Sequence, residues 1–195
     1  MQIISNHAML GLISDSVLRI PRIDALSNAL TTINHEHHEV HSGNHFELNG
    51  VVDLANGAVR DIQIITPNTT KWMHLTIHIS TESETEFYLY EDVSISVAGT
   101  AITEYNSNRN SDTAATGVLA QIDNTSVATA NIDTVVVDAE ELRHHTIGAG
   151  KDAGSLSRGQ EIILMQNTDY SVRFVANTAG FVNYTLSWYE HTSRD

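Results

Sequence analysis

The residues of this sequence best suited to chemistry are its histidines. The chain has 11 of them, and five lie between residues 35 and 45. In an extended strand alternate side chains share one face, so a strand here would gather several metal-binding groups. These are His35, His37, Glu39 and His41. Neutral imidazole and carboxylate suit zinc or nickel.

Two observations weaken the metal interpretation. The helical His-Glu-x-x-His pattern of metalloproteases is absent, and the chain has no cysteine to supply a thiolate. Imidazoles on a strand equally hydrogen-bond to backbone or contact a symmetry-related subunit. We therefore expect no bound metal, with His35, His37 and His41 as the candidate ligands if there is one. The candidate subunit-interface residues are His37, His38, His41 and His45.

A second polar motif lies in the loop 105–117. Oxygen-bearing side chains alternate there as in a calcium loop: Asn106, Asn108, Asn110 and Asp112. Ser111 stands where the turn glycine should be, and Gly117 where the bidentate glutamate should be. The pattern favours an asparagine-rich turn held by bonds from side chains to backbone.

The remaining motifs do not favour an enzyme. The run Gly148-x-Gly150-x-x-Ala153 resembles a nucleotide fingerprint but lacks a strand–helix–strand context. Glu82, Glu84 and Glu86 alternate, as charges on a solvated strand edge do. No Ser-His-Asp signature is present. We expect no catalytic activity and no cofactor.

The charge and hydropathy of the chain limit the classes of partner that it is expected to bind. A net charge of −14, with only ten scattered basic residues among 195, argues against nucleic acid binding. No apolar run approaches the roughly 20 residues of a membrane helix, so no membrane partner is expected. The first residues lack the basic region of a signal peptide, and we expect no Sec-type export.

Alternating hydrophobicity predicts a β protein. The clearest strand spans 72–80, where Met73, Leu75, Ile77 and Ile79 share one face. Asn49-Gly50 and Asn56-Gly57 are turn dipeptides. Further strands are expected at 51–54, 59–65, 86–90, 93–97, 118–122, 132–137, 161–166, 170–176 and 182–189, with another from Ala29 onward. Residues 148–159 are expected to form a flexible loop.

Many short strands with turn signals predict a sandwich or barrel. We predict an all-β fold, an antiparallel β-sandwich of jelly-roll-like form with an N-terminal arm. The expected organisation is an arm at 1–28 and a sandwich domain at 29–195. The alternative for residues 1–28, which the sequence favours equally, is an ordinary first strand and loop of the domain. Periodicity does not give the strand order.

Segments in order along residues 28–192 resemble a family of small structural proteins of tailed bacteriophages. They are Asn28-Ala29-Leu30, His37-His38-Glu39-Val40-His41-Ser42-Gly43-Asn44-His45-Phe46, Ile65-Thr66-Pro67, Lys71-Trp72-Met73-His74, Leu89-Tyr90-Glu91, Asn106-Ser107-Asn108-Arg109-Asn110-Ser111, Ile147-Gly148-Ala149-Gly150, Asn167-Thr168-Asp169-Tyr170 and Trp188-Tyr189-Glu190-His191-Thr192. The resemblance implies a capsid decoration (cement) protein. Such a subunit is a jelly-roll homotrimer that binds the major capsid protein on the exterior of the virion and stabilises the head.

The alternative is a tail or head-fibre module that binds host-surface glycan. Such a module needs exposed aromatic rings. The candidates are Tyr88, Tyr90, Tyr105 and Trp188, although core packing explains them equally well.

Overall fold

The computed structural model describes residues 12–14, 17–19, 35–95, 100–115, 119–122, 132–133, 139–155 and 160–192. The chain forms two units, Met1–His38 and Glu39–Asp195. In the first, β1 (Leu12–Ser14) and β2 (Val17–Arg19) pair as an antiparallel hairpin within the expected arm. The strand expected from Ala29 to residue 34 lies outside the described residues. In the described part of the chain, no helix is long and apolar enough to cross a membrane.

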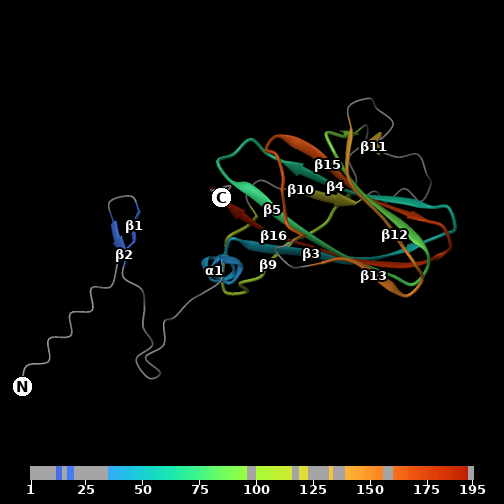
Figure 1. Ribbon diagram of the computed structural model, residues 1–195, viewed down its shortest axis with the longest axis horizontal. Coiled ribbons are helices and arrows are strands. Elements are labelled where there is room, and N and C mark those ends of the chain that lie inside the picture. Colours follow the sequence, from blue (N-terminus) through green and yellow to red (C-terminus); the bar gives the residue numbers. More distant parts are fainter. Residues whose placement is uncertain are drawn as a thin grey trace, which may run out of the picture. The chain divides into compact units, whose positions relative to one another are not determined.

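The second unit is built from strands. After the helix α1 (His35–Ser42), they are β3 (His45–Leu54), β4 (Val59–Thr66), β5 (Trp72–Thr81), β6 (Thr85–Glu91), β7 (Ser94–Ile95), β8 (Thr100–Ala101), β9 (Tyr105–Asn106), β10 (Leu119–Ile122), β11 (Ile132–Asp133), β12 (Glu140–Ile147), β13 (Lys151–Ser155), β14 (Ile162–Ile163), β15 (Thr168–Ala176) and β16 (Gly180–His191). The elements are labelled in Figure 1.

The long strands form two antiparallel sheets. Sheet I has the order β12-β6-β15-β4-β10-β8, and sheet II has the order β13-β5-β16-β3-β9, with β14 also pairing with β5. Figure 1 shows β16 running between β5 and β3. The chain changes sheet at every connection between successive long strands except from β6 to β12. This winding is that of a jelly roll, so the predicted fold class is confirmed and the strand order is now known.

The core lies between the two sheets and, among the described side chains, is filled mainly by alternate residues of the long strands. The predicted face of β5, consisting of Met73, Leu75, Ile77 and Ile79, is buried in it. Facing residues of sheet I include Ile62, Ile64, Phe87, Leu89, Val172 and Phe174. Burying each such side chain contributes about 1.5–3 kcal/mol, and this burial is the main force that holds the sheets together.

The predicted turn at Asn49-Gly50 is wrong, because β3 runs unbroken through it. Gly50 is there for a packing reason. A Cβ at this position would lie 2.4 Å from the hydroxyl oxygen of Tyr184 on the neighbouring strand. The other predicted turn, at Asn56-Gly57, is confirmed: Gly57 has a φ of +74° between β3 and β4.

The metal interpretation required the histidine-rich segment to be an extended strand, whereas residues 35–42 form the helix α1. The residues at the C-terminal end of this helix explain where it stops. Gly43 has a φ of +76°, its N–H donates to the carbonyl of Val40, and the N–H of Asn44 donates to the carbonyl of Glu39. These two bonds form a Schellman cap, which ends helices at glycine.

Three further differences concern the second half of the chain. The expected loop 148–159 contains β13, which pairs with Thr81 to Ile77 of β5. The strand β12 was not predicted, because most of its side chains are polar and exposed. This strand forms because its backbone pairs with that of β6. The strand expected at 161–166 is limited to the two residues of β14.

Candidate functional site

His45 joins three segments at the end of sheet II. Its Nδ1 lies 2.7 Å from the Ser107 hydroxyl, and its Nε2 lies 3.1 Å from the Ser187 hydroxyl. A serine next to a histidine suggests nucleophilic catalysis, in which a third, acidic group orients the histidine. Here the third group is a hydroxyl, and the exposed fractions of His45 and Ser187 are 5% and 6%. The arrangement therefore connects β3, β16 and the loop after β9.

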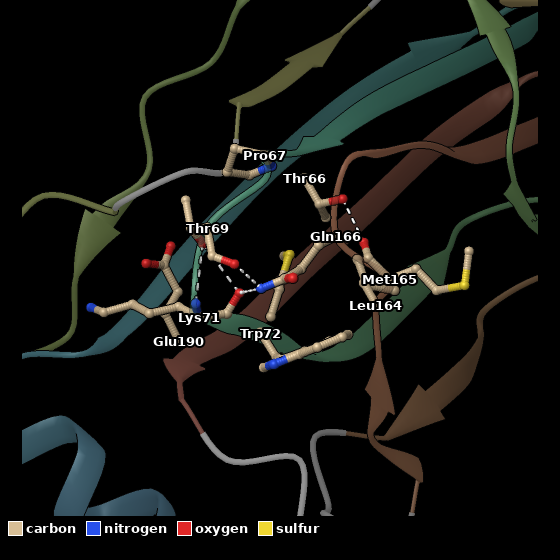
Figure 2. Close-up of a pocket in the computed structure, with 10 residues that line it drawn as sticks. Thr66, Pro67, Thr69, Lys71, Trp72, Leu164, Met165, Gln166 and Glu190 are labelled. Atoms are coloured by element: carbon tan, nitrogen blue, oxygen red, sulfur yellow. Dashed lines mark hydrogen bonds between the residues drawn. The ribbon is translucent and has the colours of Figure 1, made fainter.

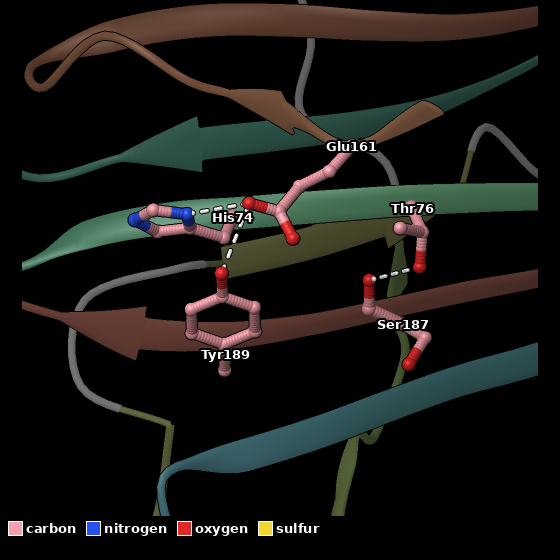
Figure 3. A network of polar contacts seen from close by, with 5 residues as sticks. All are labelled: His74, Thr76, Glu161, Ser187 and Tyr189. Carbon is pink, nitrogen blue, oxygen red and sulfur yellow. Dashed lines mark hydrogen bonds and ion pairs between the residues drawn. The ribbon is translucent and has the colours of Figure 1, made fainter. Parts of the chain in front are cut away.

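A second polar cluster lies on the outer face of sheet II and is shown in Figure 3. His74 Nδ1 lies 2.8 Å from Glu161 Oε1, and the Tyr189 hydroxyl donates to the same oxygen over 2.9 Å. The rings of His74 and Tyr189 stack with centroids 4.5 Å apart. Glu161 precedes β14, so this cluster fastens the β14 segment onto β5 and β16.

A small pocket lies between the end of β4 and the segment leading into β15 (Figure 2). The amide of Gln166 donates to the carbonyls of Thr69 and Lys71, the second over 2.8 Å. The Thr66 hydroxyl donates to the carbonyl of Met165 over 2.6 Å. A volume of about 10 Å³ admits at most one water molecule. The pocket is too small for an organic substrate.

The outer face of sheet I carries a row of stacked rings. His144 of β12 stacks on Tyr88 with centroids 4.2 Å apart, and Tyr88 stacks on Tyr90 at 5.5 Å. The guanidinium of Arg173 lies 6.0 Å from the centre of the Tyr90 ring. A hydrogen bond to Glu86 raises the pKa of Tyr88 to about 12. The rings of this row stack on one another, so each ring covers part of its neighbour's face.

A buried ion pair lies beside this row. Asp61 Oδ1 accepts a hydrogen bond from Arg173 Nε over 2.7 Å, and its Oδ2 accepts one from Nη2 over 3.1 Å. The Ser171 hydroxyl also donates to Asp61 over 2.8 Å. Asp61 is 1% exposed. The bidentate geometry suits a carboxylate removed from water, and it ties β15 to β4.

The loop after β9 is the asparagine-rich turn predicted from the sequence. Three backbone N–H groups donate to side chains two residues earlier: Asn108 to Asn106, Asn110 to Asn108, and Thr113 to Ser111. The buried amide of Asn106 donates to the carbonyls of Gly43 and Thr113 over 2.8 and 2.9 Å. Beside this loop lies an open groove of about 320 Å³.

The structure separates the histidines that the sequence placed together. His37, His38 and His41 are exposed on α1, whereas His45 is buried on β3. For His35 the backbone alone is described. Within the described ranges, no group of three histidine, aspartate or glutamate side chains could hold a metal ion.

The aromatic residues considered for glycan binding lie in three different parts of the structure. Trp188 is buried in the core, Tyr88 and Tyr90 belong to the stacked row, and Tyr105 lines the groove. The alternation of β5 could have placed His74 on the outer face of the sheet. Its partner Glu161 gave no sequence signal, because the pairing depends on tertiary structure.

No family model, curated protein or solved structure matches the chain.

Proposed function

We propose that this chain is a capsid decoration protein of a tailed bacteriophage, which binds the outer surface of the major capsid lattice and stabilises the head. The jelly-roll fold supports the proposal, since viral capsid domains use this architecture. The family resemblance of the segments between residues 28 and 192 is its second support. The protein would act as a homotrimer in the virion, through contacts and not through catalysis.

The observation that carries the proposal is the outer edge of β3. Among the described strands, only β9 pairs with this edge, and it does so at Phe46 and Glu47 alone. Beyond these residues the edge is bordered by two exposed apolar side chains and by one exposed carboxylate, that of Asp53. Val51 is 60% exposed, and Phe181 of the adjacent β16 is 47% exposed. Natural proteins usually protect long edge strands with charge, proline or bulges, whereas edges that bind a partner stay accessible.

The polar clusters favour a structural role for the domain. His45, His74, Glu161 and Asp61 are largely or fully buried and bridge strands or loops. Such bonds rigidify a scaffold. A rigid acidic subunit that is repeated by symmetry can bind firmly through many weak contacts. The exposed histidines of α1, which are His37, His38 and His41, remain candidate contacts between subunits.

The test is binding to heads from phage that lacks this gene. We expect the purified protein to occupy these heads and to raise the temperature at which they release DNA. Val51→Asp adds a charge beside Asp53 and should reduce occupancy about tenfold or more. Met165→Asp is the matched control, since Met165 is 52% exposed and lies away from β3.

Circular dichroism should show that both variants are folded. Failure of the wild-type protein to bind heads would contradict the decoration proposal. Equal binding by the wild type and Val51→Asp would show that the β3 edge is not the contact surface.

A further inference from the structure

The groove beside β9 is large enough to hold a small ligand. Its volume of about 320 Å³ lies at the lower end of the range of ligand pockets, roughly 300–1,000 Å³. The apolar side of the groove includes Tyr105, Phe46 and Ala115, and charged groups are supplied by Glu104, Arg109 and Asp112. An apolar wall with a few polar groups is the usual composition of a small-molecule site.

The walls of the groove are held in place before any ligand binds. The Tyr105 hydroxyl donates to Glu47 and accepts a hydrogen bond from Asn49 Nδ2 over 2.8 Å. The bond to Glu47 raises the pKa of Tyr105, so the ring stays neutral. The buried Asn106 holds the base of the loop. A preformed site loses less conformational entropy on binding.

The charges of the groove select the class of ligand. Glu104 and Asp112, on a protein with net charge −14, oppose an anion. The guanidinium of Arg109 lies 5.8 Å from the centre of the Tyr105 ring. It occupies the position in which a cationic ligand would gain from the aromatic ring. Together these groups disfavour ligands of either charge.

A neutral polyhydroxyl compound can form hydrogen bonds with both the carboxylates and the guanidinium of the groove. Each of its hydroxyls can donate to a carboxylate and accept from a guanidinium. Its C–H surface can lie against Tyr105 and Ala115. We infer that the groove bounded by Tyr105, Glu104, Arg109 and Asp112 binds a neutral saccharide. This site does not depend on capsid decoration, because it involves none of the exposed apolar residues beside the β3 edge.

The test is a glycan array that carries both neutral and acidic bacterial glycans, read with the full-length protein. The wild type should bind neutral glycans. Asp112→Asn and Arg109→Ala each remove one charge from the groove and should weaken binding about tenfold or more, because each loses a hydrogen bond to a charged group. Asp53→Asn is the matched control, an exposed carboxylate on β3 outside the groove, and should bind as the wild type does.

A second measurement does not depend on the variants. Titration of the wild type with the neutral oligosaccharide that binds best on the array should shift the amide NMR signals of Ala114 and Ala115. Absence of binding to any glycan on the array would overturn the inference. A preference for acidic glycans, equal binding by the groove variants, or signal shifts confined to other residues would overturn it too.

Discussion

At the residue scale, some of the buried charges in the described part of the chain are paired across strands. Asp61 is the clearest case, because two nitrogens of Arg173 and the hydroxyl of Ser171 all donate to it. A buried pair adds little net stability over an apolar pair of similar shape, but removing one partner leaves the other charge unpaired. Such residues are therefore sensitive to single substitution.

Arg173→Ala should lower the free energy of unfolding by about 3–5 kcal/mol. It leaves the Asp61 carboxylate without its cation in a buried site. Chemical denaturation at neutral pH measures the change. Arg109→Ala is the control, since Arg109 is exposed, and it should change stability by about 0.5 kcal/mol or less. Equal effects of the two substitutions would show that the Asp61 pair has no special importance.

Asp169 is a charge without such compensation. Burial raises its pKa above the ordinary value of 3.8, and the nearby Asp92 raises it further. Ionising Asp169 is therefore less favourable in the folded state than in the unfolded state. The penalty is absent below the unfolded pKa and is fully present above the folded pKa.

Asp169→Asn should therefore stabilise the protein at neutral pH, and the gain should disappear below pH 3.8. Thermal unfolding of the wild type and the variant across this pH range measures the difference. Asp53→Asn provides the comparison, as a replacement of an exposed carboxylate. A stabilisation of Asp169→Asn that persists unchanged in acid would contradict the electrostatic explanation.

At the scale of elements, the sequence predicts a strand well when one of its faces is apolar. The alternation of residues 72–80 identified β5 and its buried face. The strand β12 was missed because it pairs through its backbone, while most of its side chains are exposed and polar. Pairing with a distant strand leaves no mark on local periodicity.

The histidine-rich helix shows a signal that was present but was not used. Gly43 directly after a polar run is typical of a helix end. The histidines were instead considered as one face of an extended strand. Of the candidate site, the sequence identified the asparagine-rich turn and named Tyr105. The groove itself is formed by tertiary contacts between this turn and β3, and local patterns do not specify these.

Gly50 was interpreted as a turn residue, and the structure gives it another role. Gly50→Ala should destabilise the protein by about 1–3 kcal/mol, because the new methyl group would overlap the Tyr184 ring. In Gly50→Ala combined with Tyr184→Leu, Gly50→Ala should add less destabilisation than it does alone. Denaturation of the two single variants and the double variant measures this coupling.

Gly57→Ala serves as the comparison. It has open space around its Cβ but a φ of +74°, so its loss of stability should not depend on Tyr184. A purely additive double variant at Gly50 and Tyr184 would contradict the packing explanation.

At the scale of the whole molecule, three properties of the second unit bear on its function. The second unit is a jelly roll, its buried polar groups lock loops onto strands, and an apolar-bordered edge of β3 lies beyond the short β9 pairing. Together they describe a rigid subunit with a surface for association. These properties suit the proposed role in capsid decoration, in which the symmetry of the lattice would multiply each contact.

Cryo-electron microscopy of virions purified from cells that express this gene tests the proposed capsid decoration most directly. The account predicts density for the jelly roll on the capsid exterior at three-fold positions, with the β3 edge facing a neighbouring protein. Density for the chain at the tail or on a fibre would contradict capsid decoration.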